Sequence, residues 1–485
     1  MKATDDTYKL IKSLSQTEKR YFRVFATSSG SDKNYMKVFD ALDSLKEYDS
    51  VLLKKKLKNK KLNISYEKNY LQSLILKSLQ SYHATDSVEN EIENNIQHIR
   101  ILFKKGLHDA STKLIEKTKT LCKEHELFLE QVKLVTFERS LMLHDGRIFE
   151  EKHFTRIRNE ITELLEMETN GVDYFYLQNQ LFSKMHKTGY VKNKKEKNKF
   201  KSIINHPLLK DEKKATSFYS KRTFYYILQN YYAITYDFPK LYEVSKKYIP
   251  FKKQEYESTG DAVQYAYGLN IFFLACLSDK HYKECDDVIN TIQKLPTKNP
   301  GDEAMIFSIL LNAKLELLNK TGAYREGMNF IETIKNKFEK LLPIMRPITR
   351  MVIIYGCFQI YFCGKNLKSS LYWMQLLMEE WPKAQRPDVY IHAQIQNIML
   401  HCELNNIEQI PYLTKSLQRY LQKEKAEGAF EKIMIEFFHK SIREKVNQKE
   451  LISETKKKLS VIFTDKAYKE NTLQYFNYLL WFEVK

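Results

Sequence analysis

Amide side chains recur at one position of a repeating pattern in this chain of 485 residues. The position lies twelve residues before an apolar residue that follows a break between two helices, and two repeats place a tyrosine there. Its occupants are Asn95, Asn179, Tyr226, Asn270, Asn312 and Tyr355. A side-chain amide donates and accepts hydrogen bonds at once, as a peptide backbone does. On one face of stacked helices these side chains would form a ladder that holds an extended peptide.

We take Asn179, Tyr226, Asn270, Asn312 and Tyr355 as the candidate peptide-binding residues. Asn is a mediocre helix former, so its recurrence inside helices calls for a reason other than helix propensity. One reason is a groove that uses the amides, and the other is that Asn is simply frequent in this Lys- and Asn-rich chain. The function that we expect is that of a non-enzymatic scaffold, which binds a protein or peptide partner in the groove of a helical array.

Catalytic chemistry has no comparable signal. The motifs GxGxxG, GxxxxGK[ST], HExxH and GxSxG do not occur in the sequence. His401 and Cys402 are adjacent, but neighbouring helix positions point in different directions. His144 and His153 flank a predicted turn at a spacing that does not match closed metal sites. We therefore expect no catalytic, cofactor-binding or metal-binding residues.

The elements that would position the ladder are pairs of amphipathic helices. In the clearest pair, residues 302–343, an apolar helix pattern ends near Lys320 and Thr321-Gly322 breaks it. Tyr324 opens the second helix, which Pro343 closes. The apolar residue after the break recurs at intervals of 40 to 47 residues. Its positions are Leu107, Ile148, Val191, Phe238, Tyr282, Tyr324, Leu367 and Ile407.

Prolines and small residues mark the same unit. Four prolines lie where each second helix should end, because a proline cannot continue a helix: Pro250, Pro296, Pro343 and Pro382. Three more lie where the following first helix should begin, a position that tolerates proline: Pro300, Pro347 and Pro387. Three residues after the break, several repeats carry a small side chain that would let helices approach closely: Ala110, Cys285, Gly327 and Ser370.

The pattern Gly-x-Tyr-x-x-small, with a proline about fifteen residues on, resembles tetratricopeptide repeats. Gly322, Tyr324, Gly327 and Pro343 carry the resemblance best, and it covers roughly residues 89–465. The period of about 40–44 residues exceeds the family's usual value of about 34, as longer helices would require. The resemblance implies an all-α fold, a right-handed TPR-like α-solenoid of helical hairpins with a concave groove for peptides.

Three domains follow from this reading. Residues 1–87 form a small helical module, residues 88–465 form the TPR-like array, and residues 466–485 form a C-terminal capping helix. Stacked hairpins share one continuous core, and caps keep the ends of the stack soluble. We expect Trp481 and Phe482 in the capping helix to pack on the last repeat.

The N-terminal module offers an alternative function. Ser15 and Glu18 fit a capping box, and six lysines gather at a turn between two predicted helices, where a phosphate backbone could lie. These candidate nucleic-acid contacts are Lys54, Lys55, Lys56, Lys58, Lys60 and Lys61. A small helical module before a TPR-like array also resembles bacterial peptide-sensing regulators. However, Tyr66 and Tyr70 in the next helix look like core, and no clear base-reading motif is present.

Composition bounds both hypotheses. With only 13 Gly and 10 Pro, the sequence predicts an almost all-helical protein. Its formal charge of +19 suits an acidic protein partner or a nucleic acid, although a solvated Lys-rich surface has the same composition. The six cysteines are scattered, as in a reducing compartment. No signal peptide or membrane span is evident, so we expect a cytoplasmic protein.

Overall fold

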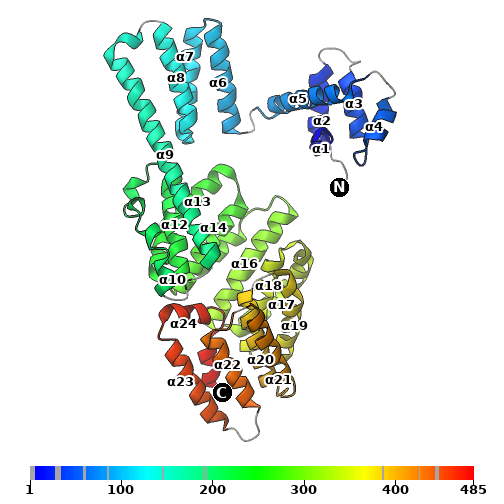
Figure 1. Ribbon diagram of the computed structural model, residues 1–485, viewed down its shortest axis with the longest axis vertical. Helices are drawn as coiled ribbons and strands as arrows, with labels where there is room; N and C mark the ends of the chain where they lie inside the picture. Colours follow the sequence, from blue (N-terminus) through cyan, green and yellow to red (C-terminus); the bar gives the residue numbers. More distant parts are fainter. Residues whose placement is uncertain are drawn as a thin grey trace. The chain divides into compact units, whose positions relative to one another are not determined.

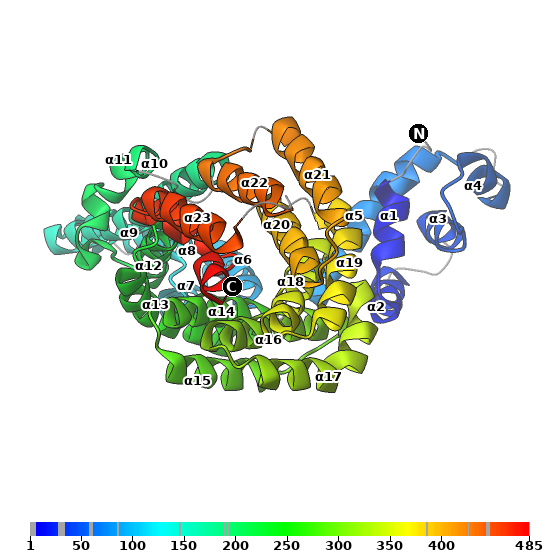
Figure 2. The same ribbon diagram turned by 90° about the horizontal axis from the view of Figure 1, so that it is seen from below.

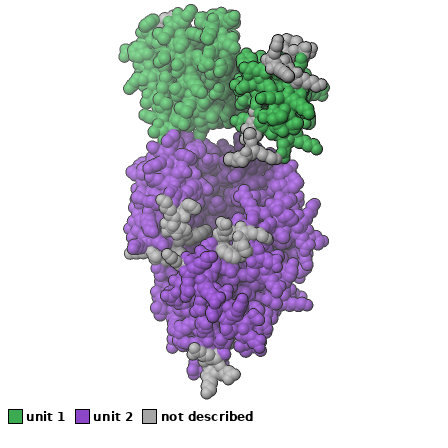
Figure 3. Space-filling model, turned by 45° about the vertical axis from the view of Figure 1, so that its right-hand side comes forward, with its two compact units in different colours: residues 1–169 green, residues 170–485 purple. Residues whose placement is uncertain are grey.

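The computed structural model confirms the all-α prediction for the residues that it describes: 6–27, 34–57, 62–84, 87–144, 147–188, 191, 194–384, 387–424, 426–442 and 447–484. The chain divides into two compact units, unit 1 (residues 1–169) and unit 2 (residues 170–485), which Figure 3 colours separately. Within the described part of the chain, no helix has both the length and the apolar character needed to cross a membrane.

Unit 1 begins with five helices that share a hydrophobic core of their own. They are α1 (Asp6–Ser13), α2 (Gln16–Thr27), α3 (Asn34–Asp43), α4 (Ser50–Leu57) and α5 (Ile64–Tyr82). The predicted capping box is present at the start of α2, where the Ser15 amide donates to the Glu18 carboxylate over 2.7 Å. In return the Glu18 amide donates to the Ser15 hydroxyl over 3.2 Å. The rings of Phe22 and Phe39, 4.8 Å apart, fix α2 against α3.

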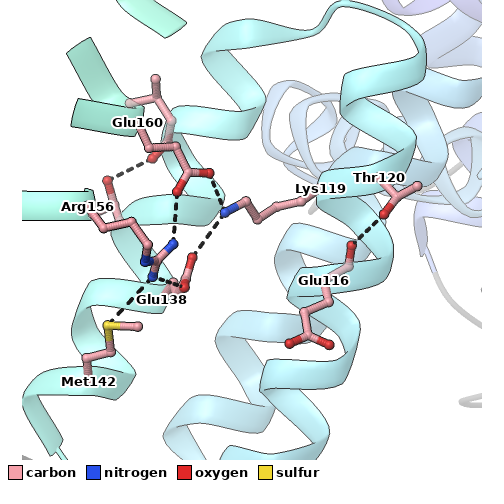
Figure 4. A network of polar contacts seen from close by, with 9 residues as sticks. Glu116, Lys119, Thr120, Glu138, Met142, Arg156 and Glu160 are labelled. Atoms are coloured by element: carbon pink, nitrogen blue, oxygen red, sulfur yellow. Dashed lines mark hydrogen bonds and ion pairs between the residues drawn. The ribbon is translucent and has the colours of Figure 1, made fainter. Parts of the chain in front are cut away.

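Four further helices follow (Figure 1). They are α6 (Val88–Lys104), α7 (His108–Glu124), α8 (Phe128–His144) and, after the 3-10 turn η1 (Arg147–Phe149), α9 (Glu151–Thr188). Figure 4 shows how charges tie α7, α8 and α9 together. Lys119 lies 3.1 Å from a Glu138 oxygen and 2.5 Å from Glu160, and Arg156 binds both carboxylates. Burial pushes the pKa of Glu138 upward, but Lys119 and Arg156 together hold it below its ordinary value.

The long helix α9 differs from the sequence prediction. A strict repeat would break this segment into two helices, whereas α9 runs without interruption for 38 residues. The physical reason lies in its sequence, which contains no proline and only one glycine, Gly171. The boundary between the two compact units, at residues 169 and 170, falls inside this helix.

Unit 2 continues with short elements and then with six pairs of helices. The short elements are α10 (Lys194–Asn198), α11 (Lys201–Ile204), η2 (Pro207–Leu209) and η3 (Glu212–Lys214). The first three pairs are α12 (Phe218–Ile234) with α13 (Phe238–Thr259), α14 (Ala262–Ser278) with α15 (Tyr282–Gln293), and α16 (Pro300–Thr321) with α17 (Tyr324–Leu341) and η4 (Leu342–Ile344). The last three are α18 (Pro347–Cys363) with α19 (Leu367–Ala384), α20 (Pro387–Glu403) with α21 (Gln409–Glu424), and α22 (Ala429–Ser441) with α23 (Gln448–Ile462).

The turns between paired helices share one backbone conformation. Six helices, five of them second helices of a pair, begin two residues after a residue with positive φ, which reverses the chain and caps the preceding helix. These residues are Gly106, Glu126, Tyr236, Lys280, Gly322 and Lys365. Four helices begin at residues that the repeat predicts, which confirms those helix breaks: Phe238, Tyr282, Tyr324 and Leu367.

The proline predictions have a mixed outcome. Pro300, Pro347 and Pro387 are the first residues of α16, α18 and α20, as predicted. Pro250 was expected to end a helix, and this prediction is wrong, because α13 continues through it to Thr259 and ends at Gly260 with φ of 66°. One missing amide donor is tolerated because the flanking turns of α13 pack on α12 and α14 along their length. In the same way, α19 continues through Pro382 to Ala384.

First helices stack on first helices in the middle of unit 2, where α14 packs on α16 and α16 packs on α18. Figure 2 shows α15 and α17 on the outer side, with α14 and α16 inside them. The small residue at position 327 permits a close approach between α17 and α18. A Cβ atom on Gly327 would lie 2.7 Å from Cδ1 of Ile360 and 2.9 Å from its Cγ2, both closer than ordinary contact.

The chain ends in two short helices instead of the single capping helix that the sequence suggests. They are α24 (Lys466–Leu473) and α25 (Tyr478–Val484). Asn477 starts α25 by accepting the amide of Leu480 over 3.2 Å, which turns the chain after Tyr475 and Phe476. Trp481 and Phe482 are buried against Phe437 of α22, which confirms the predicted packing on the last pair. We call residues 466–484 the C-terminal segment.

Candidate functional site

The candidate residues of unit 2 lie on first helices at equivalent positions. Tyr226, Asn270 and Asn312 are half-buried on α12, α14 and α16, and Tyr355 is buried on α18. We call these four residues the inner row. Solvent-accessible positions on α14 recur every three to four residues, so Asn270 belongs to one continuous stripe of that helix. The Tyr267 hydroxyl in this stripe reaches the Met305 sulfur of α16 over 2.8 Å, which joins the two helices at their accessible surface.

Asn270 and Asn312 differ in how their amides are satisfied. The Oδ1 atom of Asn270 is buried and has no hydrogen-bond partner among the described residues. Asn312 donates from Nδ2 to the carboxylate of Glu316, one turn along α16, over 3.1 Å. Burial raises the pKa of Glu316 above its ordinary value, and this effect exceeds the opposing effects of the Asn312 hydrogen bond and the Lys320 charge. Acceptors with unused capacity, such as the Asn270 oxygen and the half-buried Glu316 carboxylate, are complementary to hydrogen-bond donors.

Tyr226 and Asn179 contribute differently. The Tyr226 ring stacks on Tyr248 at a centroid distance of 5.7 Å and meets the edge of Phe182 at the same distance. Burial accordingly raises the pKa of Tyr226. Asn179 is exposed, and its amide donates to the backbone carbonyl of Phe175 in its own helix over 3.0 Å. The remaining asparagine of the sequence pattern, Asn95, belongs to unit 1 and therefore to a different compact unit.

Tyr355 is covered by the C-terminal segment. Its hydroxyl donates to the backbone carbonyl of Tyr475 over 3.2 Å, and the side-chain amide of Gln359 donates to the same carbonyl. Gln396 of α20 donates in turn to the Tyr355 hydroxyl. Burial raises the pKa of Tyr355, so the hydroxyl stays protonated as this donor role requires. Two side chains one turn apart on α18 thus donate hydrogen bonds to one backbone carbonyl, which is 120 residues from Tyr355 in the sequence.

Aromatic side chains of the C-terminal segment make further polar contacts with α20. The Tyr475 hydroxyl donates to Asp388 over 2.7 Å, and the Trp481 indole donates to Glu403 over 3.0 Å. His392 shares a 2.8 Å hydrogen bond with the Tyr478 hydroxyl and stacks on the Tyr475 ring at 4.1 Å. Burial lowers the pKa of His392 to about 3, against the attraction of Asp388, so the ring is neutral near pH 7.

The other end of the C-terminal segment reaches the first hairpin of unit 2. Asn471 donates to the hydroxyl of Tyr236 over 2.8 Å, and Gln474 donates to the same oxygen over 3.3 Å. Tyr236 occupies the turn position with positive φ, at 54°, which is uncommon for a bulky residue. Both ends of the helical array in unit 2 are therefore joined through α24.

The energetics identify the C-terminal segment as a permanent part of the site. Tyr478, Trp481 and Phe482 are at most 5% exposed. Exposing about 150 Å² of each ring at about 25 cal/mol per Å² would cost roughly 4 kcal/mol per residue and roughly 11 kcal/mol together. A ligand with micromolar affinity gains only about 8 kcal/mol on binding. Such a ligand would bind beside the segment and would not displace it.

Tyr355 and Gln359, and the residues at the same two positions of the other first helices, are called the gripping pairs. The sequence pattern identified the first residue of each pair and missed the second. Each residue of the inner row has a neighbour one helical turn, or four residues, further along the same helix. These second residues of the pairs are Asn230, Leu274, Glu316 and Gln359. Comparing position i+4 across the repeats would have revealed Glu316 and Gln359. No local signal in the sequence indicates that the backbone carbonyl of Tyr475 accepts hydrogen bonds from α18.

The candidate nucleic-acid residues are only partly described. Lys54, Lys55 and Lys56 are exposed on α4, and Lys56 binds the Ser44 hydroxyl. Lys58, Lys60 and Lys61 lie outside the described residues. The expectation that Tyr66 and Tyr70 are core residues is wrong, since 65% and 45% of their surfaces are exposed. Helix α5 turns a different face inward, which contains Leu71 and Ile75.

Comparison of the chain with models of protein families, with curated proteins and with solved structures finds no match. Among the described residues, no three His, Cys, Asp or Glu side chains gather in a way that could hold a metal ion. The arguments for function therefore rest on the arrangement of the inner row and the C-terminal segment.

Proposed function

We propose that this protein is a non-enzymatic scaffold whose unit 2 binds an extended segment of a partner protein along the inner row. Its helical pairs would act as a TPR-like array, with first helices lining the binding face. The six cysteines, all of them thiols, are in keeping with a cytoplasmic location.

One observation carries this proposal, namely the grip of Tyr355 and Gln359 on the carbonyl of Tyr475. Here a first helix already binds a peptide segment through side chains at the repeating position. The equivalent positions on α16 and α14 are Asn312 with Glu316 and Asn270 with Leu274, and among the described residues no hydrogen bond joins the C-terminal segment to these four. The positions on α14 and α16 that correspond to Tyr355 and Gln359 are therefore available to a partner.

The test begins with selection of peptides from a random heptapeptide library on the immobilised full chain. Affinities of the selected peptides are then measured for the wild type and for the double variant Asn270→Ala/Asn312→Ala. We expect the double variant to bind at least about tenfold more weakly, because two hydrogen bonds are lost. Its unfolding transition should stay close to that of the wild type.

The matched control is Asn336→Ala, which removes an amide from the outer helix α17. This control should bind the selected peptides as the wild type does. Equal affinity of the wild type and the double variant would refute the proposal, as would a selection that enriches no sequence above the background.

A second function is favoured by one observation in unit 1. Exposed Tyr66 and Tyr70 on α5, together with exposed Lys54 and Lys55 on α4, provide stacking surfaces and positive charge, the combination that binds single-stranded nucleic acid. As a nucleic-acid-associated regulator, the full chain would bind a labelled single-stranded RNA with an affinity that falls steeply with salt. Tyr66→Ala/Tyr70→Ala should weaken that binding. Binding that is absent at low salt, or insensitive to salt, would dispose of this function.

A further inference from the structure

The gripping pairs of unit 2 differ in their hydrogen-bonding capacity. On α18 the pair is Tyr355 and Gln359, and both side chains donate to a carbonyl. On α16 the pair is Asn312 and Glu316, and one of the two amide protons of Asn312 is donated to Glu316. The Glu316 carboxylate has acceptor capacity left and, when ionised, has no proton to donate. An acceptor site has therefore replaced a donor site at the equivalent position of the next helix.

Electrostatic surroundings strengthen this difference. Among the described residues no cation forms an ion pair with Glu316, although the chain carries a net charge of +19. Lys320, one turn along α16, attracts the Glu316 carboxylate without forming an ion pair with it, and Lys314 on the same helix pairs with Glu326 of α17 over 3.4 Å. Burial raises the pKa of Glu316. A half-buried carboxylate that lacks an ion pair is stabilised when a ligand brings a cation into contact with it.

The neighbouring helix adds a second acceptor. Asn270 occupies on α14 the position that Asn312 occupies on α16, and its buried Oδ1 atom has no partner among the described residues. Helices α14 and α16 pack directly against each other. The unpartnered Asn270 oxygen and the half-buried Glu316 carboxylate, on adjacent helices, match a segment that presents donors, such as a backbone amide and a charged side chain.

We infer that Glu316 is a specificity-determining residue that selects a lysine or arginine side chain in the partner's segment. Asn270 would accept a backbone amide of the same segment. This inference rests on the proposed function, because it assumes that a segment binds at the inner row. It also names a partner chemistry opposite to the one that the overall charge suggests, since a basic protein attracts acidic segments without any specific site.

The experiment uses the full chain and the random heptapeptide library described above. A selected peptide that contains a basic residue is synthesised twice, once with lysine and once with norleucine at that position. Fluorescence polarisation gives both affinities for the wild type, for Glu316→Gln and for Glu303→Gln. The Glu303 variant is the matched control, because it makes the same change on the same helix, at a more exposed ion pair with Lys337.

We expect lysine to be preferred over norleucine about tenfold by the wild type and by Glu303→Gln, and not at all by Glu316→Gln. An equal preference in Glu316→Gln would overturn the inference, as would selected peptides that lack basic residues. If such peptides still depend on Asn270 and Asn312, the proposed function stands and only the inference falls. If they depend on neither asparagine, both fall.

Discussion

Acid should destabilise unit 2 through His392, and the effect can be calculated. The His392 ring is buried between Tyr475, Tyr478 and Phe430, and burial lowers its pKa to about 3. An unfolded histidine has a pKa of about 6.5. Below that pH the unfolded chain binds a proton that the folded chain does not, so stability is present above the unfolded pKa and is lost as pH falls.

The magnitude follows from linkage. Each pH unit between about 6.5 and 3 removes about 1.4 kcal/mol of unfolding free energy through this one group. From about pH 7 to pH 5 the loss is therefore about 2 kcal/mol, and it would approach 4–5 kcal/mol near pH 3. A typical folded protein has an unfolding free energy of only about 5–15 kcal/mol, so a loss of this size should be measurable in mild acid.

Urea unfolding followed by tryptophan fluorescence reports on the relevant unit, because all three tryptophans, Trp373, Trp381 and Trp481, lie in residues 170–485. The comparison is between the wild type, His392→Gln and a half-exposed control, His439→Gln, over the range from pH 5 to 7.5. The stability difference between the wild type and His392→Gln should change by about 2 kcal/mol across this range. A constant difference would refute the reasoning, since His392 would then titrate as an ordinary histidine.

Three further predictions use the same unfolding assay. Gly327→Ala should lower the unfolding free energy by about 1–3 kcal/mol, because the new Cβ is too close to the Ile360 side chain. Adding Ile360→Val should restore part of this loss. A stabilised Gly327→Ala variant would contradict the close contact. Lys280→Gly should stabilise by about 0.5–1 kcal/mol, because φ of 65° is strained for lysine; a destabilised variant would contradict this. Glu316→Gln should stabilise the protein near pH 7, because burial raises the pKa of Glu316 and stability is lost as pH rises through the pKa of the folded state. This gain in unfolding free energy should shrink toward pH 4. A less stable variant at pH 7 would contradict the burial of the Glu316 charge.

Local patterns account for most of what the sequence predicts correctly. Pro300, Pro347 and Pro387 begin helices because a missing amide donor costs nothing in a first turn. Tyr324 begins α17 because Gly322 adopts φ of 72° without strain and reverses the chain. Each of these features is decided within a few residues, so it can be read from the sequence alone.

Packing decides the features that the sequence does not reveal. Pro250 has the same local chemistry as the prolines that end helices, yet α13 continues through it because its flanks are held by neighbouring helices. Tyr355 lies at the repeating position of the candidate peptide-binding residues. Whether its hydroxyl is available to a partner depends on Tyr475, which is far along the chain and accepts its hydrogen bond. Glu316 becomes noteworthy only once the effect of burial on its pKa and its lack of an ion pair among the described residues are known.

The most direct test of the central claim locates a bound segment on unit 2. A selected heptapeptide that carries a benzoylphenylalanine is irradiated in complex with the full chain, and mass spectrometry maps the adduct. The proposed binding mode predicts adducts on the accessible stripes of α14 and α16, at or beside Tyr267, Asn270 and Asn312. Adducts confined to the outer helices α15 and α17 would contradict it.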